Sequence, residues 1–155
     1  MKDLIIQGMI CNRRIRFCAI SGKEMISAAR KTHGLSRVAT AALGRQLLVT
    51  SMIASQMKNV TDTVTTAISG NGPAGSLVCV GRYGGLVKGY AQNPLEELPL
   101  RSDGKLDVSG YIGRTGKLSV IRDLGLKEPY VSMCNLISGE VAEDFAQYFA
   151  ASEQQ

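Results

Sequence analysis

Hydrophobic and polar positions near the N-terminus follow first a strand pattern and then a helix pattern. Two β-prone runs, Asp3–Ile10 and Arg14–Ile20, flank Asn12, and alternate residues of the second run would share one face. Lys23–Thr32 changes to helical spacing, and Gly34 follows it as a stop signal. The pattern therefore predicts a hairpin followed by a helix.

The next segment predicts a helix that is buried on nearly every side. Ser36 is a suitable N-cap, and the helix is expected to run to about Lys58. The stretch from Gln46 to Met57 carries no charge, and apolar residues surround its axis. Because a helix that is apolar all round must be packed all round, we expect one interior helix with sheet around it.

From residue 62 to residue 138 the chain is predicted to be mostly strand and turn. Val64, Thr66 and Ile68 alternate along one strand. A later run, Leu77–Val80, is more continuously apolar, which predicts a buried strand. A hairpin turn at Gly84-Gly85 would connect this run to the next strand, residues 86–92.

The second part of this region predicts an exposed connection, a further hairpin and a last strand. Pro94–Gly104 contains two prolines and a cluster of acidic residues, which is typical of an exposed segment. Val108–Ile112 and Leu118–Arg122 are expected to pair as a hairpin closed by Gly113–Gly116. Tyr130–Ile137 is expected to form the last strand.

The C-terminal segment predicts an amphipathic helix capped by Ser138. One face of this helix carries Val141, Phe145, Tyr148 and Phe149. A stripe with this spacing indicates core packing, and a partner-binding face is the alternative. The predicted fold class is therefore α+β, with layered β-sheets around a central buried helix and a C-terminal amphipathic helix.

Two glycine patterns resemble nucleotide-binding loops but lack the context that such loops need. Gly70, Gly72 and Gly75 have the G-x-G-x-x-G spacing, yet Pro73 removes one N–H donor and the following Ser76–Val80 is a β-type run, not a helix start. The pair at positions 116 and 117 resembles the end of a Walker A loop, but leucine replaces the required Ser/Thr. We therefore predict that these glycines form turns and that the chain has no cofactor site.

The net charge of +5 is distributed unevenly along the sequence. Residues 1–58 contain ten Lys/Arg and two Asp/Glu, whereas the remainder contains eight and eleven. A basic half raises the question of nucleic acid, but Phe17 is the only aromatic residue in that half and no zinc-finger spacing is present. Nucleic-acid binding is therefore disfavoured, and we expect the basic half to contact acidic groups within the fold or in a further segment.

The four cysteines, Cys11, Cys18, Cys79 and Cys134, show no C-x-x-C pairing. In a hairpin that turns at residues 12–13, Cys18 would lie opposite residue 7 and not opposite Cys11. Reduced thiols are the favoured interpretation, and disulfides or a metal site are the alternatives. Two enzyme hypotheses stay open: a thiol paired with the single histidine, His33, or a carboxylate site using one of the adjacent acidic pairs at 96–97 and 143–144.

Length and hydropathy place the chain among single-domain proteins without a signal peptide. A chain of 155 residues is long enough for one domain with its own core. The first residues form too short an apolar run for a secretory signal, and no apolar stretch approaches about 18 residues. We expect a cytoplasmic protein that does not span a membrane.

Taken together, these segments resemble the N-terminal domain of the redox-regulated thirty-three-kilodalton heat-shock chaperone family of bacteria. The resemblance extends over essentially all of residues 1–155. It rests on five motifs in the expected order: Leu43-Gly44-Arg45 in the apolar helix, Gly70-Asn71-Gly72-Pro73-Ala74-Gly75, Val87-Lys88-Gly89-Tyr90-Ala91-Gln92-Asn93-Pro94, Asp123-Leu124-Gly125-Leu126-Lys127-Glu128-Pro129-Tyr130, and Ser138-Gly139-Glu140-Val141-Ala142-Glu143-Asp144 with Tyr148-Phe149 and Ser152-Glu153-Gln154.

The resemblance implies a holding chaperone that works without ATP and is not an enzyme. Its partners would be unfolded or oxidatively damaged client proteins, and it would act as a homodimer. In this family a C-terminal module binds one zinc ion through four cysteines, and oxidation releases the zinc and exposes a client-binding surface. None of the four cysteines has the required spacing. We therefore expect no catalytic residue, no cofactor and no metal ligand in this chain, with the zinc module absent and the client-contact residues unidentified.

Overall fold

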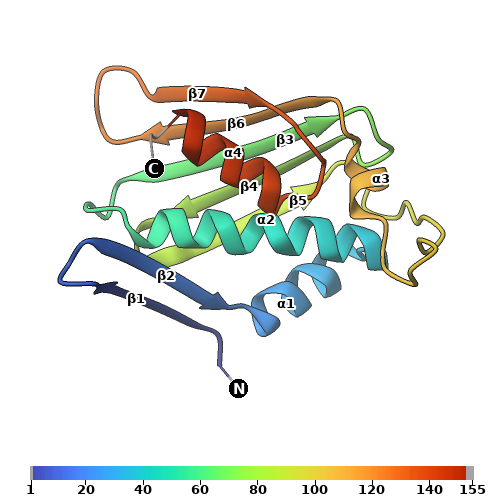
Figure 1. Cartoon of the computed structure of the whole chain (residues 1–155), viewed down its shortest axis with the longest axis horizontal. Helices are drawn as coiled ribbons and strands as arrows, with labels where there is room; N and C mark the ends of the chain where they lie inside the picture. The colour runs from blue at the N-terminus through green and yellow to red at the C-terminus, as the bar shows by residue number, and fades with distance from the viewer. Residues whose placement is uncertain (1, 153–155) are drawn as a thin grey trace.

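The computed structural model describes residues 2–152 and consists of a five-stranded antiparallel sheet, a separate hairpin and helices packed between them (Figure 1). The sheet has the strand order β5-β4-β3-β6-β7. Its strands are β3 (Thr63–Gly70), β4 (Ser76–Arg82), β5 (Leu86–Ala91), β6 (Gly116–Asp123) and β7 (Tyr130–Asn135). A short 3-10 turn, η1 (Tyr83–Gly85), connects β4 to β5, as the glycine pair predicts.

The N-terminal hairpin has the predicted register. Strands β1 (Leu4–Ile10) and β2 (Ile15–Ser21) pair antiparallel, and Gln7 lies opposite Cys18. The hairpin contacts the rest of the protein through its inner face, where Gln7 Nε2 donates to Ser55 Oγ at 2.5 Å. It leads directly into α1 (Lys23–His33).

Two helices follow with the predicted capping. The carboxylate of Asp3 accepts hydrogen bonds from the first-turn N–H groups of α1, and Gly34 ends that helix in the left-handed conformation. Helix α2 (Arg37–Ser55) begins after Ser36, whose Oγ accepts from Ala39 N. It ends three residues before the predicted Lys58, because the last N–H groups bond i−3 carbonyls and tighten the chain into a turn.

Helix α2 is the central element of the core, as its uncharged sequence predicts. It packs against β3, β4 and β5, and eleven of its 19 residues are buried. A buried polar cluster fixes its position on the sheet. Gln46 Nε2 donates to Thr66 O, Thr66 Oγ1 and Leu77 O at 3.0–3.2 Å, and the Thr50 and Thr66 hydroxyls lie 2.7 Å apart.

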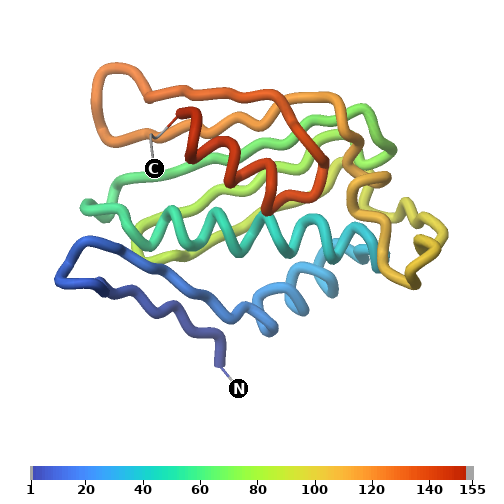
Figure 2. The backbone as a smooth tube through the Cα atoms, viewed as in Figure 1, coloured from blue at the N-terminus to red at the C-terminus, as the bar shows by residue number. Residues whose placement is uncertain are grey.

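The prediction of a strand at Val108–Ile112 is wrong, since this segment forms the short helix α3. Asp107 caps it by accepting from Gly110 N at 2.8 Å, and the two largest side chains of α3, Tyr111 and Ile112, are buried. β6 instead pairs with β3 and β7. The connection before α3, residues 92–107, runs beyond one end of the sheet and is mostly exposed, as predicted (Figure 2).

The C-terminal helix α4 (Ala142–Ser152) begins later than predicted. Ser138 does not cap it; its Oγ accepts from Glu140 N within the preceding turn. Asp144 organises this corner, because its Oδ1 accepts from the backbone N–H groups of residues 137 and 138. The predicted apolar stripe faces the core, where Tyr148 and Phe145 are buried against the sheet.

Helix α2 is the one helix in the described part of the chain that is long and apolar enough to cross a membrane by length and composition. Most of its apolar stretch is buried inside the protein. Core helices pass the same test, so this observation is weak evidence for a membrane span.

Candidate functional site

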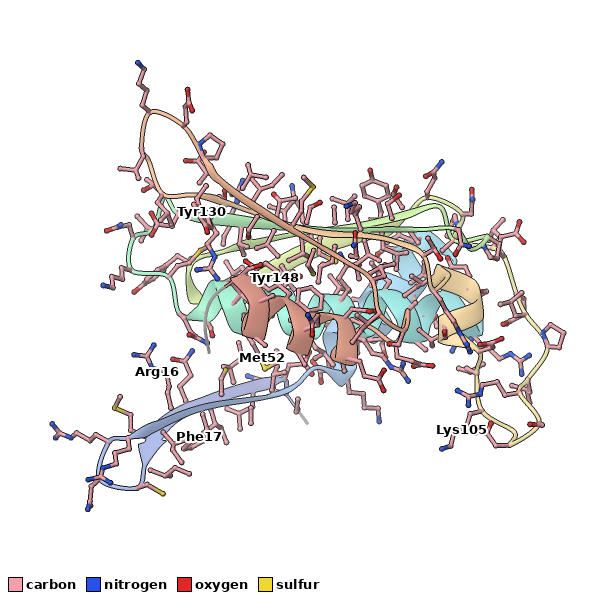
Figure 3. The ribbon with its side chains drawn as sticks, turned by 45° about the horizontal axis from the view of Figure 1, so that its top comes forward. Arg16, Phe17, Met52, Lys105, Tyr130 and Tyr148 are labelled. Atoms are coloured by element: carbon pink, nitrogen blue, oxygen red, sulfur yellow. The ribbon has the colours of Figure 1, made fainter. Side chains whose placement is uncertain are left out.

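The two faces of the five-stranded sheet differ in what covers them. Helices α2 and α4 lie on one face (Figure 1). The strand residues on that face are buried, and they include Val64, Thr66, Ile68, Leu77, Cys79, Leu118 and Val120. Among residues 2–152, no helix packs on the opposite face, from which side chains project freely (Figure 3).

The central part of this opposite face, called the open face below, consists of two adjacent cross-strand rows. The pairing register defines them as Tyr90, Val78, Ala67, Ser119 and Met133 in the first row and Lys88, Val80, Thr65, Ile121 and Val131 in the second. Directly paired side chains on one face of a sheet lie within contact distance. The two rows therefore form one continuous surface across all five strands.

These two central rows are mostly apolar, whereas the flanking positions of the same sheet face are more polar and include Arg82, Lys117 and Asp123. Tyr90, Val131 and Met133 are 50%, 53% and 61% exposed. The central valines and isoleucine are half-buried by their neighbours only. Lys88 is the one ionisable side chain in the ten positions apart from the phenol of Tyr90. A contiguous apolar surface without a cover is typical of a site that binds protein.

Sequence reasoning missed this surface because it read Leu77–Val80 as a buried strand. In the structure the strand alternates: Leu77 and Cys79 are buried, whereas Val78 and Val80 lie on the open face. A continuous apolar run is compatible with either arrangement. The available signal was that β-branched residues also occupy the outward positions of β6 and β7, at Ile121 and Val131.

The Gly70–Gly75 segment forms the turn between β3 and β4, as predicted. Two of its N–H groups are directed at α3, because Gly72 N donates to Ile112 O at 3.0 Å and Ala74 N donates to Tyr111 O at 2.9 Å. A Cβ atom at Gly72 would overlap the backbone of α3. The glycines thus allow close backbone packing, and their N–H groups do not form a phosphate cradle.

The structure does not bring a thiol together with the histidine. Cys79 is buried in the core beside Thr50, and burial raises the pKa of its thiol to about 12 despite the Thr50 hydrogen bond. His33 is exposed at the end of α1. Burial, followed by the charge of Asp144, also raises the pKa of Cys134. All four cysteines are free thiols, and both raised pKa values oppose thiolate formation.

The two adjacent acidic pairs have structural roles. Glu97 caps the start of α2, where it accepts from Arg37 N and Val38 N and pairs with the Arg37 side chain at 3.1 Å. Desolvation opposes ionisation of Glu97, but these hydrogen bonds outweigh it and lower the pKa of the carboxyl group. In the second pair, Glu143 is exposed while Asp144 is buried, so the two carboxylates do not share a site.

A zinc site does not fit the residues that the structure describes. Among them, no group of three or more His, Cys, Asp or Glu side chains gathers where it could hold a metal ion. The cysteines are distributed between the tip of the hairpin, the core and the sheet.

Comparison with known proteins agrees with this arrangement. The profile of the family described as Hsp33 protein matches residues 3–155. This chain belongs to the Hsp33 family. It is 49% identical over 154 residues to the 33 kDa chaperonin of Carboxydothermus hydrogenoformans and 44% identical to that of Thermoanaerobacter sp. (strain X514). The match covers 99% of this chain in both cases, and 53% and 52% of the relatives.

The fold comparison gives the same result. The crystal structure of the 33 kDa chaperonin from Thermotoga maritima superimposes with a TM-score of 0.92 at 43% identity, over 97% of this chain and 51% of that one. The chain thus spans about half the length of the Hsp33 relatives that it matches, and it corresponds to their N-terminal domain. The relatives that it matches are described as 33 kDa chaperonins, which agrees with the prediction of a chaperone that is not an enzyme.

Proposed function

We propose that this Hsp33 domain holds unfolded client proteins on the open face of its sheet and protects them from aggregation without ATP. The observation that carries the proposal is the continuous apolar surface across β5, β4, β3, β6 and β7. An unfolded chain exposes apolar side chains, and their burial on such a surface stabilises a complex that requires no specific sequence.

Rigidity of the sheet supports this function. The hydrogen bonds of Gln46 and Thr50 fix α2 under the strands, so the open face is a preformed platform and little order must be created on binding. Met133 and Tyr90 at opposite edges add side chains that adapt to varied partners. ATP has no role in this proposal, and the N–H groups of Gly72 and Ala74 in the glycine-rich turn donate to α3, where they support the fold.

The finer features of the proposal concern the whole protein. The clients would be proteins unfolded under oxidative stress in the cytoplasm, and the domain would act as a homodimer. In the longer relatives, redox control through zinc would belong to the region that this chain does not span.

The test is suppression of aggregation of a chemically denatured client, followed by light scattering in the absence of ATP. Met133→Glu places a charge on the open face and is expected to raise the chaperone concentration needed for half-protection roughly fivefold, equivalent to about 1 kcal/mol. Leu95→Glu is the matched control, since Leu95 is 75% exposed but lies on the connection between β5 and α3. Equal effects of the two substitutions, or no protection of several clients by the unaltered domain, would refute the proposal.

A further inference from the structure

A concave site lies away from the open face, between the N-terminal hairpin and the body of the protein. This groove, called the β2 groove below, has a volume of about 590 Å³. Its floor comes from the outward side of α2 and from α4, and includes Val49, Met52, Ile53 and Phe149. Figure 3 shows Met52 and Arg16 in the space between the hairpin and α2. The volume is in the range of natural ligand sites, and its floor is apolar.

The rim of the β2 groove is positively charged. Arg16, Lys58 and Arg122 line it, against the single carboxylate of Asp62. Asp62 is buried and already accepts hydrogen bonds from the N and Nδ2 atoms of Asn59. Within residues 2–152, neither Arg16 nor Lys58 takes part in an ion pair. Arg16 and Lys58 therefore offer positive charge that no ion pair in the described part of the fold neutralises.

One wall of the groove is an unpaired strand edge. β2 pairs only with β1 among the described strands, so its other edge has backbone donors and acceptors available for a further strand. The hairpin residues that line the groove, Arg16 and Cys18, both belong to β2, and no residue of β1 lines it. A two-stranded hairpin is marginal by itself, and a third strand would stabilise it.

Together, these features favour an extended polypeptide as the occupant. We propose that the β2 groove binds an extended segment that contains both carboxylate and apolar side chains, and that this segment adds as a third strand to β2. Its carboxylates would face Arg16 and Lys58, and its apolar side chains would cover the exposed side of α2. The inference rests on the proposed function for one point only, the source of the segment, which is an unfolded client.

The groove is a poor match for nucleic acid, although its rim is basic. Single strands bind on aromatic stacking platforms, and Phe149 is the one aromatic residue among the groove residues. A sugar–phosphate backbone would lose water against the aliphatic and thioether floor of the groove and would gain no hydrogen bonds from it. Charge and floor together fit an acidic, apolar peptide better.

The probe is a fluorescein-labelled eight-residue peptide that alternates valine and glutamate, with binding followed by fluorescence anisotropy. Arg16→Glu and Lys58→Glu are each expected to weaken binding by about tenfold, because each replaces an attraction by a repulsion. Lys105→Glu is the matched control with the same change of charge; Lys105 lies on the connection before α3, well away from Arg16 (Figure 3). It is expected to leave the affinity unchanged.

A second pair of probes tests strand addition separately from charge. Successive residues of a strand direct their N–H groups to opposite edges, so N-methylation of either the valines or the glutamates blocks only one edge. One methylated peptide is expected to lose binding and the other to keep it. Equal behaviour of the two would overturn the proposal.

Three other results would also overturn it: no binding of the peptide, equal effects of the rim and control substitutions, or displacement of the peptide by a single-stranded oligonucleotide at equal concentration. Circular dichroism of each variant establishes that it is folded. The light-scattering assay separates this inference from the proposed function. Protection of clients by the unaltered domain, combined with no binding of the peptide to that same domain, would refute the β2 groove site and leave the open-face proposal intact.

Discussion

Truncation of Gln46 is expected to weaken the central packing of the domain more than any change on its surface. Gln46 is fully buried in α2, and its Nε2 lies 3.0–3.2 Å from Thr66 O, Thr66 Oγ1 and Leu77 O. Gln46→Ala removes the donor and leaves these acceptors in a dry interior. The helix then loses its polar attachment to β3 and β4.

The expected loss can be worked out from these contacts. An amide group carries two N–H donors, and each net hydrogen bond contributes about 1 kcal/mol, so the donor contributes about 2 kcal/mol. The cavity left by the missing side chain adds about 1 kcal/mol. Gln46→Ala should therefore lower the free energy of unfolding by about 3 kcal/mol, which corresponds to a fall of roughly 6–12 °C in Tm for a domain of this size.

Denaturant unfolding followed by circular dichroism measures this change. Gln46→Met separates its two parts, because methionine fills most of the space without donating and also removes Oε1, an atom with no partner among the described residues. The free energy of unfolding of Gln46→Met is expected to lie between that of the unaltered protein and that of Gln46→Ala. Gln147→Ala, on the exposed side of α4, is the matched control and should cost less than about 0.5 kcal/mol. If Gln46→Ala costs no more than Gln147→Ala, the assignment of the cluster as the main polar attachment is wrong.

Three further predictions concern single residues. Gly72→Ala should cost several kcal/mol in urea unfolding, because its Cβ would meet the backbone of α3, whereas Gly84→Ala has open space and should cost only about 1 kcal/mol from its positive φ; equal losses would contradict this account. Burial raises the pKa of Cys79 from 9.0 to about 12, so unfolding between these pH values releases a proton. The free energy of unfolding should therefore fall as pH rises through this interval, and less steeply in Cys79→Ala. Parallel pH profiles of the two proteins would exclude this contribution. Asp107→Ala removes the cap of α3 and should lower the free energy of unfolding by about 1 kcal/mol in chemical denaturation, with Asp107→Asn closer to the unaltered protein; a larger loss for asparagine than for alanine would argue against capping.

The sequence predicts the elements that depend on local signals. The register of the hairpin follows from the position of its turn, and Ser36 and Gly34 identify helix ends through their capping chemistry. The burial of α2 follows from the absence of charge between Gln46 and Met57. In each case one short stretch contains all the information that the prediction needs.

The remaining features depend on contacts between distant segments. Val108–Ile112 is apolar and short, so periodicity cannot distinguish a strand from one turn of helix; the cap at Asp107 was the available signal. The start of α4 depends on a carboxylate, Asp144, that bonds the backbone of an earlier turn. The open face and the β2 groove arise only when strands from different parts of the sequence assemble, which no local pattern specifies.

The order of strands has a consequence for the folding kinetics of this domain. β3, β4 and β5 form one local meander and β6 with β7 another, but the two meet only where β3 pairs with β6, from Gly70 opposite Gly116 to Thr63 opposite Asp123. The chain from β4 to α3 must close into a loop before β3 and β6 can pair. This loop closure has an entropic cost that local hairpins do not incur. Pairing of β3 with β6 is therefore expected to be the slow step of refolding. Substitutions at Ala67 or Ser119 should slow folding more than substitutions within η1.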